Sequence, residues 1–194
     1  YDVILTTASL SLRLAMIAPR LKAATIGWQH NCYDGYLHVK PVVFWQQENL
    51  LQQYLPNLDR YIVLSDYDKR DYMEKLGIDC EVKINPRSFV SEKKCDVKSK
   101  RFLMATRFVY AKGLDLMMES FEEFCKEDSE WELDIIGDGD LFDQIRADAK
   151  KRHLEKRVHF VGYTNEPEKY YLNSSVFLLP SRWEGWPMVI MEAF

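Results

Sequence analysis

The sequence predicts an α/β protein built from two parallel sheets, and three features of the chain support this prediction. Short apolar runs of strand length alternate with longer segments of helical periodicity through most of the 194 residues. A polar, charged stretch interrupts the alternation once, between residues 86 and 100. Parallel strands need crossover helices, so each half should be a sheet with helices packed on it. We therefore expect one domain over residues 1–85, a linker over 86–100 and a second domain over 101–194.

Composition limits the classes of protein to which the chain could belong. A hydrophobic content of 47% is enough for a sizeable core, and no run of 18 apolar residues predicts a membrane span. The net charge of −4 and the pI near 5.6 argue against nucleic-acid binding. The four cysteines show no C-x-x-C pairing, which favours free thiols in a reducing compartment over a zinc site or a disulfide framework. Because the chain opens on Tyr1 and stops at Phe194 just after a helix begins, we interpret it as an internal piece of a longer protein.

In the first half, the apolar runs and their periodicity predict four strands and three helices. A serine before the third helix is a suitable N-cap, and Gly77 is a suitable residue to end it. The strands are expected at residues 2–6, 24–28, 61–64 and 81–84, and the helices at 10–21, 42–55 and 67–76.

The second half repeats the same alternation. Its last apolar run, residues 176–179, is predicted to be a buried parallel strand. The strands are expected at residues 101–105, 131–136, 158–161 and 176–179, and the helices at 114–125, 141–153 and 166–172.

The rest of the chain is organised around the segment that follows the last strand, P-S-R-W-E-G-W-P-M-V-I-M-E at residues 180–192. A strand, a glycine-containing turn and a helix start form a layout in which backbone N–H groups can hold a phosphate. Glu184 and Glu192 flank the turn; eight helical steps between them would span roughly 12 Å, enough for a sugar, a diphosphate and a ribose. The alternative is that both are solvated charges near a helix start, but Glu192 lies too deep in the helix to benefit from the dipole.

The full string P-S-x-x-E-G-x-P-x-x-x-x-E-A resembles that of the retaining GT-B glycosyltransferases of family 4, which transfer a sugar from a nucleotide-sugar donor. The resemblance implies two Rossmann-like domains, the first on the acceptor side and the second binding the donor, each matched in part. It implies that Glu184 fixes sugar hydroxyls and Glu192 the ribose. It also implies that backbone N–H groups of the intervening segment hold the phosphates and the sugar. That segment comprises Gly185, Trp186, Pro187, Met188 and Val189.

Two cations in the string T-R-F-V-Y-A-K-G-L-D are candidate catalytic residues. Arg107 and Lys112 follow a predicted strand and precede a helix, a position from which cations can neutralise a departing diphosphate. The string resembles the family's Arg/Lys pair followed by K-G-x-D. The alternative is a loop with ordinary surface cations.

Two further segments resemble donor-binding parts of the family. Gly137-Asp138-Gly139 resembles a turn that lets the chain bend sharply above the donor, although a plain strand-to-helix turn explains it equally well. Val161-Gly162-Tyr163 resembles the segment that frames the nucleobase, partly through backbone atoms.

His30 is the candidate site residue in the first half. The string W-x-H-N resembles a family segment whose histidine approaches the donor sugar, while the alternative is a structural histidine. Trp28, Tyr36 and Trp45 could stack on a sugar or lipid acceptor, but core packing is the favoured explanation for most of them.

The main functional hypothesis is a retaining glycosyltransferase that needs no cofactor and no metal, with a UDP- or GDP-sugar as donor. The resemblance implies a saccharide or lipid-linked acceptor and a role in surface polysaccharide or glycolipid synthesis. It also implies a cytoplasmic location, with peripheral contact to the inner face of the membrane as a further expectation. The basic residues of the linker and of 150–157 could meet anionic lipid, but solvated charge is the favoured interpretation. Two alternatives stay open: an epimerase or phosphorylase of the same fold, and a truncated nucleotide-binding or inert fragment.

Overall fold

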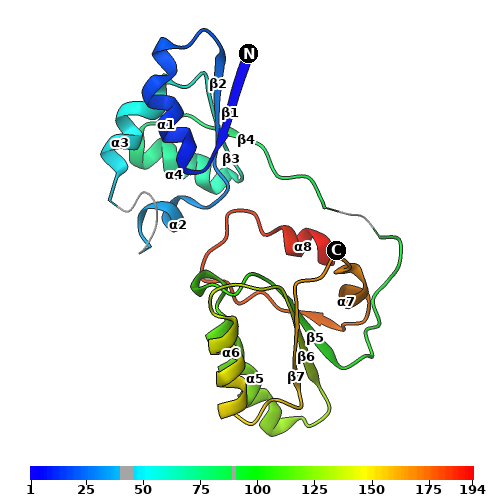
Figure 1. Ribbon diagram of the computed structural model, residues 1–194. Coiled ribbons are helices and arrows are strands. Elements are labelled where there is room, and N and C mark those ends of the chain that lie inside the picture. The colour runs from blue at the N-terminus through cyan, green and yellow to red at the C-terminus, as the bar shows by residue number, and fades with distance from the viewer. Residues whose placement is uncertain (40–45, 89–90) are drawn as a thin grey trace. The chain divides into compact units, whose positions relative to one another are not determined.

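The computed structural model describes residues 1–39, 46–88 and 91–194 and divides the chain into two compact units (Figure 1). The first holds Tyr1–Pro86 together with Glu184–Pro187, and the second holds Arg87–Trp183 together with Met188–Phe194. Each unit contains a four-stranded sheet, and all the strand pairings among the described residues are parallel. The predicted α/β class with two parallel sheets is confirmed.

In the first unit, the strands are arranged in the order β1-β2-β3-β4, so each strand pairs with its successor in the chain. Right-handed crossovers through helices are the usual connection for such an order. The elements are β1 (Val3–Thr7), α1 (Ser9–Ile17), β2 (Ala24–Trp28), α2 (Tyr33–Leu37), α3 (Glu48–Tyr54), β3 (Arg60–Val63), α4 (Asp66–Leu76) and β4 (Glu81–Val82), with 3₁₀ turns η1 (Ala18–Arg20) and η2 (Leu55–Asn57).

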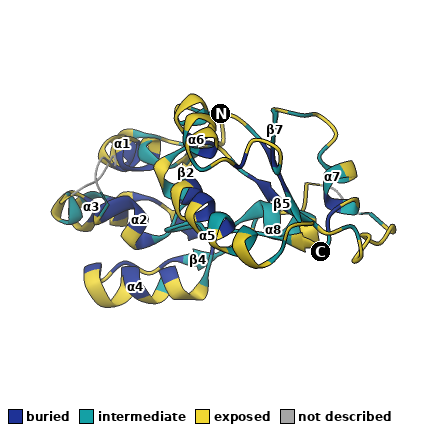
Figure 2. Ribbon diagram, turned by 90° about the horizontal axis from the view of Figure 1, so that it is seen from below, coloured by how far each residue is buried: buried dark blue, intermediate teal, exposed yellow. Residues whose placement is uncertain are grey.

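The core of the first unit lies between this sheet and its helices. Side chains of α1, α2, α3 and α4 join those of β3 in one cluster of buried residues. Figure 2 shows the consequence for α4, which is buried along one side and exposed along the other. The predicted caps of α4 are confirmed: the Ser65 hydroxyl accepts a hydrogen bond from the Asp68 N–H at 3.1 Å, and Gly77 ends the helix with φ of +68°.

Three predictions for the first unit need correction. The helix expected over 42–55 is described only as α3, from Glu48, because Gln46 has a positive φ that no helix accepts; residues 42–45, with Trp45, lie outside the described residues. The short helix α2 was not predicted, since five residues with a central glycine give no periodicity. The strand expected over 81–84 pairs only at Glu81–Val82.

In the second unit, the strand order is β7-β6-β5-β8. The chain adds β6 and β7 on one side of β5 and then returns to add β8 on the other side of β5. Such a reversal is the topological switch at which open α/β sheets bind ligands. The elements are β5 (Arg101–Ala105), the 3₁₀ turn η3 (Tyr110–Lys112), α5 (Leu114–Glu127), β6 (Glu132–Ile136), α6 (Phe142–Lys151), β7 (Val158–Gly162), α7 (Glu168–Leu172), β8 (Val176–Phe177) and α8 (Met188–Ala193).

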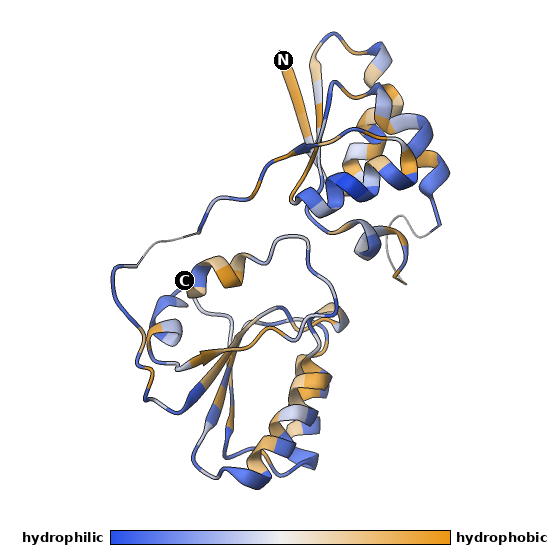
Figure 3. Cartoon of the chain, turned by 180° about the vertical axis from the view of Figure 1, so that it is seen from behind, coloured by the Kyte–Doolittle hydropathy of each residue, from blue (hydrophilic) through white to orange (hydrophobic). Residues whose placement is uncertain are grey.

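Helices cover both faces of the second sheet. The apolar sides of α5 and α6 pack with one set of strand residues, and Tyr171 of α7 and Val189 of α8 pack with another set. Figure 3 shows the hydropathy of these helices: α5 and α6 carry hydrophobic and hydrophilic sides, as expected for helices that cover a sheet. Because all the strands of this sheet are parallel, their carboxyl ends lie together, between the two helical layers.

The strand before the 180–192 segment differs from its prediction. It pairs in parallel with β5, but only over Val176–Phe177, and it lies at the edge of the described sheet. Val176 is 39% exposed, so the run is partly rather than fully buried. An edge strand has a neighbour on one side only, which explains both its short pairing and its exposure.

The described part of the segment 86–100 forms neither helix nor strand, and from Arg87 on it belongs to the second unit, where it hydrogen-bonds to α7. The Asp96 N–H donates to the Leu172 carbonyl at 2.9 Å, and the Ser91 hydroxyl donates to a Glu168 carboxylate oxygen at 2.7 Å. None of the helices in the described ranges combines the length and the apolar character that crossing a bilayer requires.

Candidate functional site

The predicted donor-binding residues of the second unit lie where its four strands end. Arg107 follows β5, Gly137 follows β6, Tyr163 follows β7 and Pro180 lies three residues beyond β8. Because β5 to β8 are parallel, these ends lie along one edge of the sheet. The edge includes the topological switch between β5 and β8, the usual place for a ligand in an open α/β sheet.

The glycines of the G-D-G turn allow close contact with the loop after β5. A Cβ on Gly137 would lie 1.8 Å from the Thr106 carbonyl oxygen, and Gly137 has a φ of +122°. A Cβ on Gly139 would lie 2.8 Å from the Phe108 nitrogen. The Phe108 N–H donates to the Asp138 carbonyl at 2.9 Å, which joins the two loops directly. These contacts hold the turn directly against the loop that carries Arg107.

The two predicted cations lie at the ends of one short loop. Arg107 is exposed, while Lys112 is half-buried at the end of η3. Gly113, with φ of +66°, changes the chain direction immediately before α5 begins. The loop is short and hydrogen-bonded, with the Lys112 N–H donating to the Val109 carbonyl at 3.0 Å. The backbone therefore fixes the starting point of both side chains.

The segment that begins at Pro180 packs against this cation loop. The Arg182 N–H donates to the Ala111 carbonyl at 2.8 Å. A Cβ on Gly113 would lie 2.2 Å from the Pro180 carbonyl oxygen, so only glycine allows this approach. Two motifs therefore meet in space: the K-G-L-D string and the P-S-R-W-E-G string. Asp115 of the first and Arg182 of the second are 67 residues apart in the sequence.

Arg182 was not predicted as a site residue, yet its side chain has the most specific contacts in this region. It donates to both oxygens of Asp115, at 2.8 and 2.6 Å, and to the Tyr110 carbonyl at 2.8 Å. These hydrogen bonds and the positive charge of Arg182 lower the pKa of Asp115 below its ordinary value. The pair therefore stays ionised at neutral pH, and its contribution to stability is lost only as the pH falls through the lowered Asp115 pKa. The sequence signal was the aspartate of K-G-L-D, which had no predicted partner.

The helix that carries Glu192 is shorter than predicted. It begins at Met188, and Glu184, Gly185, Trp186 and Pro187 belong to neither helix nor strand. The expectation of eight helical steps between Glu184 and Glu192 is therefore wrong, because only the last part of that interval is helical. Pro187 also lacks an N–H, so it cannot donate a backbone hydrogen bond to a phosphate.

Glu192 is half-buried and accepts a hydrogen bond from the Tyr171 hydroxyl at 3.0 Å. Burial, reinforced by the negative charge of Glu192, raises the pKa of Tyr171, so the phenol remains a donor throughout the neutral range. This arrangement argues against a solvated helix-start charge. Tyr171, on α7, orients the carboxylate and was missed because nothing in a tyrosine of a helical segment distinguishes it from a core residue.

We expect Tyr171→Phe to weaken nucleotide binding about 3- to 10-fold, the equivalent of one net hydrogen bond. Glu192 would keep its charge but lose the donor that fixes its orientation. Titration calorimetry with UDP and with GDP measures the effect, and Tyr170→Phe, which removes the hydroxyl of the adjacent residue, is the control. Equal affinity of Tyr171→Phe and the unsubstituted chain would contradict the orienting role.

The remaining predicted residues of this unit divide into core and surface. Val161 and Val189 are partly buried and pack on the small core cluster that includes Tyr171. Tyr163 is 78% exposed. The Gly137 N–H donates to the Gly162 carbonyl at 2.8 Å, which aligns the ends of β6 and β7.

His30 lies in the first unit, just after β2. The ring of Trp28 is 5.1 Å away between centroids. Desolvation of the His30 imidazole lowers its pKa below the ordinary value, so the ring is neutral at pH 7 and offers one hydrogen-bond donor and one acceptor. Tyr36 is buried in the first core, which agrees with core packing rather than stacking on an acceptor.

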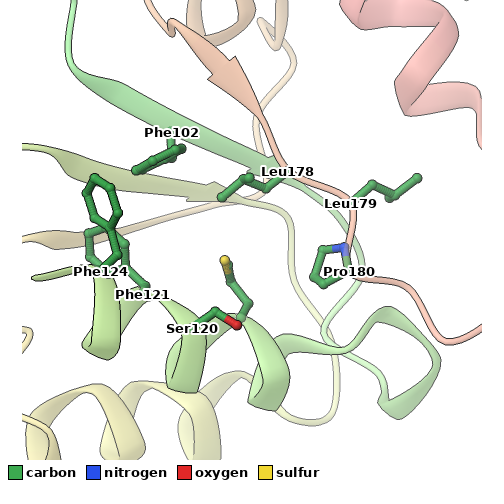
Figure 4. Close-up of a pocket in the computed structure, with 8 residues that line it drawn as sticks. Phe102, Ser120, Phe121, Phe124, Leu178, Leu179 and Pro180 are labelled. Carbon is green, nitrogen blue, oxygen red and sulfur yellow. The ribbon is translucent and has the colours of Figure 1, made fainter.

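An apolar cavity of about 380 Å³ lies between α5 and the residues that follow β8. Figure 4 shows the rings of Phe102, Phe121 and Phe124 on one side of it, and Leu179 and Pro180 on the other. Ser120 is the polar residue among those that line it, and the lining includes no cation that could hold a diphosphate. Within the described ranges, no group of three or more His, Cys, Asp or Glu residues is arranged to hold a metal ion.

Comparison with known proteins adds a family match over the second half of the chain. Residues 88–194, more than half of the chain, match the model of the family described as glycosyl transferases group 1. An uncharacterised glycosyltransferase of Haemophilus influenzae is 29% identical over 137 residues, which cover 70% of this chain and 39% of that protein. The amylovoran biosynthesis glycosyltransferase AmsD of Erwinia amylovora is 33% identical over 96 residues, 50% of this chain and 27% of that protein. The chain thus spans well under half the length of these relatives.

Solved structures show the same fold. A point mutant of TarM of S. aureus, in complex with Fondaparinux, alpha-GlcNAc-glycerol and UDP, superposes with a TM-score of 0.77 at 22% identity, covering 88% of this chain and 35% of that one. The apo form of the lipopolysaccharide outer core galactosyltransferase WaaB superposes with a TM-score of 0.69 at 26% identity, covering 99% of this chain and 53% of that one. The two Rossmann-like units are those of GT-B glycosyltransferases.

Proposed function

Because the chain belongs to the glycosyl transferases group 1 family, we propose that it forms the donor-binding part, and some of the acceptor side, of a retaining glycosyltransferase of family 4. The donor is a nucleoside diphosphate sugar, and the acceptor is a saccharide or a lipid-linked saccharide in surface polysaccharide or glycolipid synthesis. The reaction takes place in the cytoplasm at the inner face of the membrane. AmsD of Erwinia amylovora, named for amylovoran biosynthesis, and WaaB, named as a lipopolysaccharide galactosyltransferase, support this setting.

The observation that supports the proposal best is the meeting of the cation loop with the segment that starts at Pro180. The Arg182 N–H donates to the Ala111 carbonyl at 2.8 Å, and the Gly113 backbone approaches Pro180 directly. Two motifs distant in the sequence therefore reach one edge of one sheet. A plain pair of surface loops would not require glycine at the contact.

The proposed mechanism is electrostatic. Arg107 and Lys112 neutralise the diphosphate as the bond from the anomeric carbon to the phosphate oxygen breaks. The acceptor oxygen forms the new bond to the anomeric carbon, and the departing phosphate oxygen takes the proton of the acceptor hydroxyl. Backbone N–H groups of Trp186, Met188 and Val189 contact the phosphates and the sugar. The two cations supply the positive charge that a divalent metal supplies in other transferases, so no metal is needed.

The remaining roles are those of positioning. Glu184 accepts hydrogen bonds from the sugar hydroxyls, and Glu192, oriented by Tyr171, accepts them from the ribose. Gly137 and Gly139 shape the turn next to the donor, and the backbone at Val161 with the exposed Tyr163 frames the base. His30, neutral at pH 7, contributes a hydrogen bond to the donor sugar from the acceptor side.

Titration calorimetry of the chain with UDP and GDP separately tests this proposal. We expect one nucleotide to bind, and Arg107→Ala and Glu192→Ala to weaken that binding. Lys156→Ala is the matched control, because Lys156 is an exposed cation two residues before β7 and therefore at the opposite end of that strand. Binding that is as weak in Lys156→Ala as in Arg107→Ala would show a non-specific charge effect. Absence of binding by both nucleotides would contradict the donor site.

A further inference from the structure

Arg182 belongs to the segment that begins at Pro180, and its side chain contacts the cation loop, residues 107–112, and the start of α5. Its guanidinium donates to both Asp115 oxygens and to the Tyr110 carbonyl. The guanidinium carbon also lies 4.0 Å from the centroid of the Tyr110 ring. The side chain is only 19% exposed although it carries a full charge.

These contacts differ from an ordinary surface ion pair. A single exposed pair contributes little, because water and salt screen it and both side chains lose freedom. Asp115 is itself 57% exposed, so charge attraction alone would be weak here. The arrangement instead uses the planar shape of the guanidinium, which matches the two oxygens of a carboxylate while its face stacks on a ring. The specific contribution of Arg182 is therefore the planar geometry of its guanidinium, more than its positive charge.

Arg182 is close in the chain to residues of both proposed functional groups. Glu184 is two residues further on, so its Cα lies within roughly 7.6 Å of the Arg182 Cα. Ala111, which accepts the Arg182 backbone hydrogen bond, directly precedes Lys112. The close approach of Gly113 to Pro180 is a second contact on the other side of Lys112. Movement of the segment at Arg182 would therefore break its contacts on both sides of Lys112.

We propose that Arg182 is a positioning residue, which through Asp115 and Tyr110 holds the loop of Lys112 and the segment 180–183 in the one relative placement that the donor requires. This inference rests on the proposed function, because it assigns that loop and that segment to the same ligand. Arg182 itself does not touch the reacting atoms. Its effect on donor binding is exerted through the backbone hydrogen bond from Arg182 to Ala111.

The test uses Arg182→Lys and Asp115→Asn, with hydrogen exchange at the residue-182 amide and titration with UDP and GDP. Lysine keeps the charge but not the planar fork, so both variants should exchange this amide at least about 10-fold faster and bind nucleotide about 5- to 10-fold more weakly. Arg152→Lys is the matched control: Arg152 donates to Asp148 at 2.9 Å and pairs with Glu122 in the same unit. It should leave both measurements unchanged.

Tyr110→Leu, which removes the exposed ring beneath the guanidinium, should also speed amide exchange at residue 182 and weaken nucleotide binding, but by less than Arg182→Lys does.

The outcomes separate this inference from the proposed function. Unchanged exchange at residue 182 in Arg182→Lys and Asp115→Asn would overturn the positioning role. Faster exchange with undiminished nucleotide affinity would also overturn it, since a merely structural contact would behave in that way. If the unsubstituted chain binds neither nucleotide, the proposed donor site fails, and the exchange measurement alone then decides whether Arg182 fixes the two segments.

Discussion

Replacing Arg107 or Lys112 with alanine should weaken the binding of UDP or GDP about 10- to 100-fold. Charge-assisted hydrogen bonds to an anion contribute roughly 1.5 to 3 kcal/mol each, and about 1.4 kcal/mol corresponds to a factor of ten. The two residues lie at the ends of one hydrogen-bonded loop, so both side chains start from a fixed backbone. Titration calorimetry of each variant, and of the double variant, measures the loss.

Salt dependence distinguishes this role from a general loss of positive charge. Raising the salt concentration from about 0.05 to about 0.5 M should weaken nucleotide binding by the unsubstituted chain more than by the double variant, because screening acts on the charges that are present. Lys156→Ala, at the opposite end of β7, should behave as the unsubstituted chain does. An affinity loss of less than about twofold in both single variants would remove Arg107 and Lys112 from the donor site.

Gly137→Ala should destabilise the second unit by about 3 to 5 kcal/mol, through backbone strain together with overpacking. The new Cβ would lie 1.8 Å from the Thr106 carbonyl oxygen, and φ at this position is +122°. Backbone atoms cannot move aside as the end of a flexible side chain can. The loop that carries Arg107 would have to shift. Chemical denaturation followed by circular dichroism measures the change in unfolding free energy.

Gly162→Ala is the matched control for this prediction. Gly162 also has a positive φ, +80°, and it lies at the end of the neighbouring strand β7, but a Cβ there would meet nothing within 4 Å. Only the backbone strain remains, so we expect a loss of about 1 to 2 kcal/mol. Similar losses of unfolding free energy in the two variants would mean that the close approach to Thr106 does not contribute to the destabilisation.

The contrast between these glycines illustrates what periodicity and motifs can predict. The sequence predicted a turn at 137–139 because two glycines follow an apolar strand. It did not distinguish Gly137 from Gly162, because the difference lies in what each backbone approaches in space. The caps of α4 at Ser65 and Gly77 were predictable, since capping depends on neighbours within one turn of the chain.

The candidate site shows the same division. Arg107, Lys112, Glu184 and Glu192 were identified from their motifs, and they remain the basis of the proposed function. The partners of these motifs were not identified. Arg182 meets Asp115 across 67 residues, and Tyr171 meets Glu192 across 21. Neither pair has a periodicity or a spacing that a single sequence could reveal.

By itself, the sequence determined the α/β class, the alternation of elements and the residues that carry charge at the strand ends. These follow from local chemistry: apolar periodicity, capping groups and turn residues act over a few positions of the chain. Only the tertiary structure decided the order of the strands, the edge position of β8, the start of α8 at Met188 and the meeting of Gly113 with Pro180. The physical reason is that these depend on which surfaces pack together, and packing joins residues that the sequence separates.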